Sequence, residues 1–139
     1  MTDWRSSASE EAQADLDGLT GLTLEFATEQ VGTHGAVAPF AIVTGTDGAT
    51  RQVMVDDDAD AATLVALLTA QVREQRDDIR AAAFVADVTA EQLGGDAVRV
   101  LLEHQDGIAL AVYLPYTITG SGAEFGQLVA GVGAHQIWS

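Results

Sequence analysis

Hydrophobic residues recur at three- and four-residue intervals in two parts of the chain, and this spacing predicts two helices. The first helix follows a small, polar stretch at residues 1–9, which we expect to form a flexible N-terminal arm. The apolar face of this helix consists of Leu16, Leu19, Leu22 and Phe26. Gly32 and Gly35 are expected to end it, because glycine is unfavourable in helix interiors and frequent just beyond helix ends.

The second helix is predicted over residues 59–78. Its apolar face consists of Leu64, Leu67, Leu68 and Val72. Acidic residues at 56–60 precede it, and Arg73, Arg76 and Arg80 collect at its far end. Both groups of charges match the helix dipole, which favours acids at the N-terminus and bases at the C-terminus.

Between the two helices the sequence predicts a β-hairpin, with strands at 40–44 and 51–55 and a turn at Asp47-Gly48. A two-residue loop places Ile42 opposite Val53, whereas a three-residue loop places Ile42 opposite Gln52. Because apolar side chains are expected to match across the pair, we predict the two-residue loop.

After the second helix, three strands are predicted at 81–88, 97–104 and 108–118. If residues 105–107 form a three-residue loop, Val98, Val100 and Leu102 face Leu114, Val112 and Leu110, and one face becomes almost wholly apolar. This matching predicts that Gly107 adopts the left-handed conformation of a bulged turn. Pro115 lacks an N–H group and is expected at an edge or a bulge. One short helical turn around Phe125 and Leu128 is predicted afterwards.

These elements predict the α+β class, in the order α-β-β-α-β-β-β, for a single domain spanning residues 10–139. The hairpin and the three later strands are expected to form one five-stranded antiparallel sheet with packed helices. This order resembles the roadblock and longin modules of the profilin-like class, which bind other proteins. The resemblance is one of topology and carries no functional motif.

Residues 96–116, together with the preceding Pro39-Phe40-Ala41, resemble a small family of uncharacterised bacterial proteins. The likeness is carried by Leu-Glu-His-x-Asp-Gly at 102–107 and Leu-Pro-Tyr at 114–116, and it covers about two-thirds of the chain. What the resemblance implies is a hairpin signature without established chemistry.

The chain of 139 residues contains 21 acidic residues and six arginines, which leave a formal net charge of -15. Such a surface disfavours nucleic-acid phosphates and anionic lipid headgroups, because both require excess basic residues. We therefore expect neither nucleic acid nor membrane as a partner. Genomic bias or adaptation to salt explains the acidity most simply, and binding of a basic protein or mimicry of nucleic acid are the alternatives.

The chain has no cysteine, which excludes disulfides, thiolate metal sites and cysteine nucleophiles. No stretch approaches the length of about 18 apolar residues that a membrane span requires, and no apolar leader follows the N-terminus. These features predict a cytoplasmic protein.

Glu103, His104 and Asp106 form a tight cluster of residue types found in catalytic sites. Neighbouring residues on a strand point to opposite faces, so Glu103 and His104 are expected to diverge. His104 and Asp106 then remain as candidates for a general base and the carboxylate that orients it. The alternative interpretation is a histidine at the rim of the sheet beside a turn aspartate that bonds its own backbone.

Three further patterns suggest ligands but match them poorly. The acids at 56–60 lack the glycine and glutamate of a calcium loop, and they are better interpreted as helix-capping residues. The glycine-rich residues 120–126 lack the rest of a dinucleotide-binding unit, and a turn is the better reading. The three histidines have no paired ligand spacing, so neither a metal nor a cofactor is predicted.

A face of the last hairpin that no helix covers would form a contact surface. We expect this surface to involve Leu101, Tyr113, Tyr116 and Trp138. The leading hypothesis is a non-enzymatic protein-interaction module whose acidity favours a basic partner, and a homodimer is compatible with it. The alternative is a small enzyme or ligand-binding domain centred on His104 and Asp106.

Overall fold

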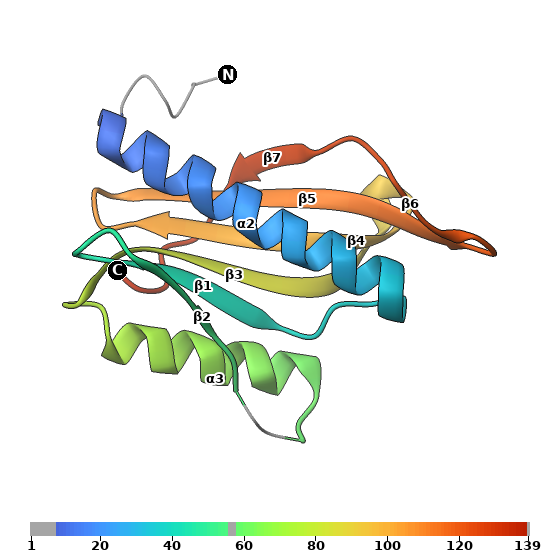
Figure 1. The fold of residues 1–139 in the computed structure, drawn as a ribbon, viewed down its shortest axis with the longest axis horizontal. Coiled ribbons are helices and arrows are strands. Elements are labelled where there is room, and N and C mark those ends of the chain that lie inside the picture. The colour runs from blue at the N-terminus through green and yellow to red at the C-terminus, as the bar shows by residue number, and fades with distance from the viewer. Residues whose placement is uncertain (1–7, 56–57, 139) are drawn as a thin grey trace.

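The computed structural model describes residues 8–55 and 58–138, and this part of the chain forms an antiparallel sheet with two helices packed against it (Figure 1). The elements in chain order are α2 (Glu10–His34), β1 (Phe40–Gly45), β2 (Thr50–Val53), α3 (Ala61–Glu74), β3 (Ile79–Ala90), the 3-10 turn η1 (Glu91–Leu93), β4 (Gly95–His104), β5 (Ile108–Thr119), β6 (Gly122–Phe125) and β7 (Val129–Val132). The fold belongs to the α+β class, as the sequence predicts. The predicted arm lies outside the described residues except for Ala8 and Ser9.

The sheet has seven strands in the described part of the chain, so the prediction of five is wrong. The strand order is β2-β1-β3-β4-β5, and the outer side of β5 pairs with both β6 and β7. The two additional strands replace the helical turn predicted around Phe125 and Leu128. Five glycines between Gly120 and Gly133 disfavour a helix there, and pairing with β5 satisfies the backbone groups instead.

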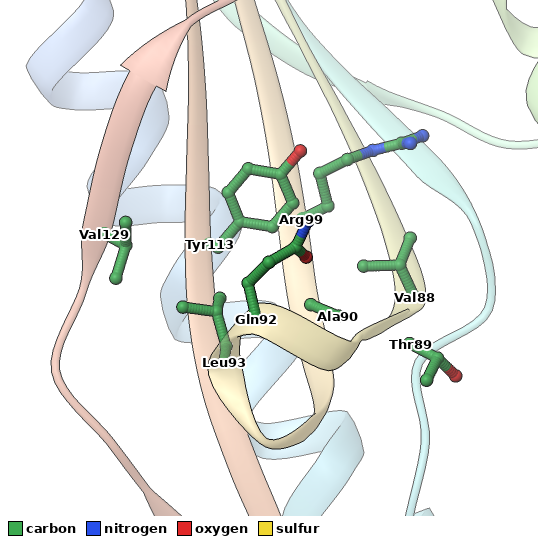
Figure 2. A pocket seen from close by; sticks show the side chains of 8 residues that line it. All are labelled: Val88, Thr89, Ala90, Gln92, Leu93, Arg99, Tyr113 and Val129. Carbon is green, nitrogen blue, oxygen red and sulfur yellow. The ribbon is translucent and has the colours of Figure 1, made fainter.

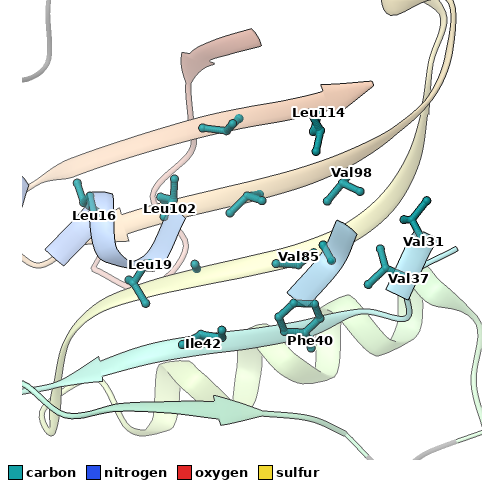
Figure 3. Close-up of a cluster of buried hydrophobic side chains, with 14 of the residues drawn as sticks. Leu16, Leu19, Val31, Val37, Phe40, Ile42, Val85, Val98, Leu102 and Leu114 are labelled. Atoms are coloured by element: carbon teal, nitrogen blue, oxygen red, sulfur yellow. The ribbon is translucent and has the colours of Figure 1, made fainter. Parts of the chain in front are cut away.

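One hydrophobic core lies between α2 and the sheet (Figure 3). Leu16, Leu19 and Val31 of α2 pack on side chains that alternate along β1, β3, β4 and β5. The sheet contributes Phe40, Ile42, Ala81, Ala83, Val85, Val98, Val100, Leu102, Val112, Leu114 and Tyr116. The long helix thereby joins strands from both halves of the chain.

The structure explains both ends of α2. The Ser9 hydroxyl accepts the Ala12 N–H at the start, and Gly35, at φ 77°, caps the end by donating its N–H to the Val31 carbonyl. Gly32 lies within the helix, so the prediction that it helps to end the helix is wrong. The prediction that Leu22 lies on the buried face is also wrong. Its side chain is 42% exposed, because Thr23 occupies the buried position and donates its hydroxyl to the Leu19 carbonyl.

Helix α3 packs on the opposite face, mainly against β3 and β1. It begins later and ends earlier than predicted, and Asp60 is its N-cap, where the carboxylate accepts the Thr63 N–H at 2.8 Å. Hydrogen bonds from the Thr63 side chain and from its backbone N–H lower the pKa of the Asp60 carboxyl. Leu68 and Val72 are buried as predicted, whereas Leu67 is 38% exposed. Leu68 and Val72 contribute to a second core with Ala41, Val43, Val53, Ile79, Ala82, Phe84 and Ile137.

The predicted register of the β1–β2 hairpin is wrong, because Ile42 pairs with Gln52. The loop contains three residues, 46–48, and Gly48 has a φ of 88°. Strand β1 is buried on both faces, so apolar matching on one face does not select the register. The observed register pairs Val53 with Ala41 and places it in the second core.

The predicted register of the β4–β5 hairpin is confirmed. Val98, Val100 and Leu102 pair with Leu114, Val112 and Leu110. Gly107 has a φ of 94° and donates its N–H to the His104 carbonyl at 3.0 Å. Pro115 lies where the partner of β5 changes from β7 to β6, so its missing N–H interrupts neither pairing.

Candidate functional site

His104, the residue proposed as a general base, ends β4 and is fully buried under α2. Its Nε2 lies 2.9 Å from Oδ2 of Asp15, and its Nδ1 accepts the backbone N–H of Asp106 at 3.1 Å. A neutral imidazole with its hydrogen on Nε2 satisfies both contacts. The ring therefore uses both nitrogens within the protein.

The carboxylate of Asp106 lies 3.7 Å from Nδ1 of His104 and is 45% exposed. Its Oδ2 accepts the hydroxyl of Ser9, at the start of α2, at 3.1 Å. The predicted pair is therefore close in space, but Nδ1 of His104 already accepts the backbone N–H of Asp106. The alternative interpretation, a rim histidine beside an aspartate that bonds its own backbone, differs from the structure in two respects: His104 is fully buried, and the Asp106 carboxylate bonds Ser9.

Asp15 completes a polar cluster between α2 and the ends of β3 and β4. Nε and Nη2 of Arg80 donate to its two oxygens, each at 2.9 Å, and His104 donates to Oδ2. Burial raises the pKa of the Asp15 carboxyl, but hydrogen bonds from Arg80 and His104 outweigh it and leave the pKa below its ordinary value. Asp15 in turn raises the pKa of Arg80. This cluster fixes α2 on the sheet.

Glu103 points to the opposite face, as predicted, and its side chain is also buried. Its carboxylate accepts the backbone N–H groups of Gln136, Ile137 and Trp138 at distances between 2.6 and 3.1 Å. Ile137 is fully buried in the second core. A charged acceptor for three successive donors holds the C-terminal segment against the sheet.

The four residues predicted as a contact surface lie in three different places. Leu101 and Trp138 pack against the second core, and Tyr113 lies further along the same face of the sheet. Tyr116 is buried on the other face, in the core under α2. The structure therefore does not bring these four side chains together on one surface.

The hydroxyl of Tyr116 donates to the carboxylate of Asp87, with oxygens 2.8 and 2.7 Å away. Burial, together with the hydrogen bond and the negative charge of Asp87, raises the pKa of Tyr116 far above its ordinary value. Asp87 also accepts the Val37 N–H at 3.3 Å, after the end of α2. This pair ties β3 to β5 across β4.

A hollow of about 430 Å³ opens beside Tyr113 on the α3 side of the sheet (Figure 2). It is lined by Val88, Thr89, Ala90, Gln92, Leu93, Arg99, Tyr113 and Val129. Figure 2 shows the stem of Arg99 next to the Tyr113 ring, with the guanidinium extending toward Val88. His104 and Asp106 do not line this hollow, so the cavity and the predicted catalytic pair are separate.

The outer edge of the sheet, residues 118–132, gathers exposed apolar side chains. Ile118, Phe125, Leu128, Val129 and Val132 belong here, and they are five of the eight large hydrophobic residues exposed in the described part. Val132 is 93% exposed. Strand β7 pairs with β5 on one side and with no other described strand on its second side. Sequence reasoning missed this edge because it assigned a helical turn to the segment.

Within residues 8–55 and 58–138, no three His, Asp or Glu side chains are grouped as metal ligands. No helix in this part is both long and apolar enough to cross a membrane. Of the acidic run before α3, Asp56 and Asp57 lie outside the described residues, and Asp60 is a helix cap. Of the glycine-rich residues 120–126, Gly120 and Ser121 form the turn between β5 and β6, whereas Gly122–Phe125 form β6, so the turn interpretation fits only the start of this segment.

No protein-family model, no curated protein and no solved structure matches the chain. The resemblance of residues 102–107 and 114–116 to a bacterial family stays a prediction. A functional proposal therefore depends on the arrangement of the chain's own residues.

Proposed function

We propose that the protein is a non-enzymatic interaction module that binds an extended segment of a basic protein along β7. The observation that carries this proposal is the unpaired side of β7, which offers backbone donors and acceptors next to exposed apolar side chains. Strand addition at such an edge combines main-chain hydrogen bonds with pockets for alternate side chains.

The orientation of the β7 backbone supports this mode of binding. Gly133 donates its N–H to the Ala109 carbonyl of β5. Because alternate residues of a strand bond the same neighbour, the N–H and C=O groups of Gly131 and Val129 also point toward β5. Ala130 and Val132 consequently direct their N–H and C=O groups away from β5. These are the groups that a bound strand would use.

The charge distribution supports a basic partner rather than a second copy. Residues 125–139 contain no Asp, Glu, Lys or Arg, whereas the whole chain carries a formal charge of -15. Two copies meeting at this edge would repel each other, and a basic segment would be attracted by the surrounding acids. Burial of His104 and satisfaction of both its ring nitrogens also favour binding over catalysis.

The test uses proline to block one edge at a time. Val132→Pro removes an outward N–H without disturbing the bonds between β7 and β5. Gln52→Pro is the matched control, because Gln52 occupies the corresponding outward position on β2 at the opposite edge. We expect the parent and Gln52→Pro to retain the same basic protein from a native lysate, and Val132→Pro to lose it.

Retention by the parent should weaken as salt rises from about 0.05 to 0.5 M, because screening shortens the reach of the acidic surface. Equal retention by the parent and Val132→Pro would overturn the proposal. Light scattering provides a second outcome against it. A dimer that Val132→Pro converts to a monomer would identify a second copy as the occupant of β7.

A further inference from the structure

Arg99 differs from the other arginines of the described chain in its surroundings. It lies on β4 between Ala86 of β3 and Tyr113 of β5, on the face of the sheet that carries α3. Arg80 is paired with Asp15, and Arg51 bonds Gln75. Nε of Arg99 is buried and has no hydrogen-bond partner among the described residues. A buried donor without a partner is uncommon, and an acceptor from outside the chain, such as a bound ligand, would satisfy it.

Two hollows meet at this side chain. The hollow of about 430 Å³ lies toward η1 and β7, as Figure 2 shows, and one of about 370 Å³ lies toward the first turns of α3. Val88 and Arg99 line both of them. Cavities of this volume are typical of sites for small organic ligands.

The lining is apolar and carries no acidic side chain that faces Arg99 from the described residues. Leu93, Tyr113 and Val129 form one side, and Ala61, Ala62 and Val65 of α3 form the other. Asp87 borders the second hollow, but its carboxylate bonds Tyr116 on the opposite face of the sheet. Among the described residues the guanidinium therefore has no acidic partner, although the chain as a whole is strongly negative.

We propose that Arg99 binds the carboxylate of a small amphipathic monoanion whose apolar part fills the hollow beside Tyr113. The planar guanidinium fits a carboxylate through two parallel hydrogen bonds, and a carboxylate supplies the acceptor that Nε lacks. One arginine on an acidic body favours a single negative charge over a phosphate dianion. The Tyr113 hydroxyl, Gln92 and Thr89 provide further polar groups around the opening. This proposal does not rest on the proposed strand addition, although Val129 of β7 lines the hollow.

The experiment is a titration of the whole ¹⁵N-labelled chain with octanoate, followed by NMR, with 1-octanol as the uncharged comparison. We expect octanoate to shift signals of Arg99, Tyr113 and Val129 and to bind at least about tenfold more tightly than 1-octanol, as a charged hydrogen bond implies. Arg99→Gln should bind octanoate no better than 1-octanol. Arg51→Gln, which removes the same charge from an exposed site on β2, should bind as the parent does.

Equal affinity for octanoate and 1-octanol would overturn the carboxylate assignment, and so would unchanged octanoate binding in Arg99→Gln. Shifts that avoid the residues around the hollow, or no binding at about 10 mM, would overturn the site itself. If Arg99→Gln does not fold, Arg99→Lys tests the same point. Lysine keeps the positive charge but lacks the two parallel N–H donors of the guanidinium. The affinity of this variant for octanoate should therefore fall between the affinities of the parent for octanoate and for 1-octanol.

Discussion

The carboxylate of Asp15 on α2 lies 2.9 Å from Nε2 of His104 at the end of β4, although 89 residues separate them in the chain. This contact places a charged group of the first helix directly above the turn between β4 and β5. Arg80 approaches the same carboxylate from β3. The Asp15 carboxylate therefore connects α2 with β3 and β4. Removal of its charge tests how much this contact contributes to holding α2 on the sheet.

Asp15→Asn should lower the free energy of unfolding by about 2–3 kcal/mol near pH 7, because hydrogen bonds to a charged group are worth more than neutral ones. The pKa of Asp15 is lowered in the folded protein, so its contribution is present above the ordinary value near 4 and is lost as the pH falls. Denaturant unfolding at several pH values should show the gap between parent and variant closing in acid. Glu29→Gln, at an exposed position of α2, should show no such gap.

Glu103→Gln should release the C-terminal segment. The carboxylate has two acceptor oxygens for the three N–H groups, whereas the amide has only one. We expect a loss of about 2–3 kcal/mol in unfolding free energy. In a Trp4→Phe background, Trp138 emission should shift to longer wavelength in buffer. Glu124→Gln, on exposed β6, is the control, and an unchanged spectrum in Glu103→Gln would contradict the role given to this carboxylate.

Gly107→Ala should destabilise the protein by more than about 1 kcal/mol, because Gly107 has a φ of 94° and alanine resists that conformation. A Cβ at this position meets no other atom within 4 Å, so the effect isolates the backbone conformation. Urea unfolding measures it. A loss of only a few tenths of a kcal/mol would contradict the bulged turn.

Gly133→Ala tests the attachment of β7 by a steric route. A Cβ on Gly133 would lie 2.7 Å from the backbone carbon and oxygen of Leu110, closer than such atoms approach in proteins. The variant should therefore detach β7 and also lose the partner that Val132→Pro loses. Gly131→Ala, whose Cβ meets nothing within 4 Å, should keep β7 in place. Backbone NMR shifts of residues 129–132 distinguish the two results.

The stability of the protein should fall in alkali above about pH 10. At that pH the Tyr116 phenol begins to ionise in the unfolded chain, whereas in the folded protein it keeps its proton. The raised pKa means that folding favours the protonated phenol, so this contribution is present below pH 10 and is lost as the pH rises. Thermal melts between pH 8 and about 11 measure the slope. Tyr116→Phe should flatten that slope, whereas a slope identical to that of the parent would exclude Tyr116 as its source.

Local patterns predicted the elements whose pairing is determined by neighbouring residues. In the β4–β5 hairpin only one loop length makes a face apolar, so Val100 opposite Val112 could be foreseen. In β1 both faces are buried, and the same argument selected the wrong partner for Ile42. Strand β7 escaped prediction because it contains only four residues, one of them a glycine, and because its position depends on pairing with β5.

The candidate sites were less predictable because they join distant parts of the chain. The spacing of Glu103 and His104 correctly indicated that they face opposite sides of the sheet. Nothing near them in sequence indicates that Asp15 bonds one or that residues 136–138 bond the other. The buried Nε of Arg99 is likewise a property of tertiary packing, since a lone arginine on a strand usually directs its charge to solvent.

The anchoring of residues 136–138 by Glu103 also predicts how the folded protein fluctuates. The three amide hydrogens held by that carboxylate belong to no strand ladder, so they depend on a single side chain. They should exchange with deuterated water through a local opening, faster than the central amides of β3 and β4, which require global unfolding. Because Ile137 belongs to the second core, each such opening should expose that core briefly while the sheet and both helices stay folded.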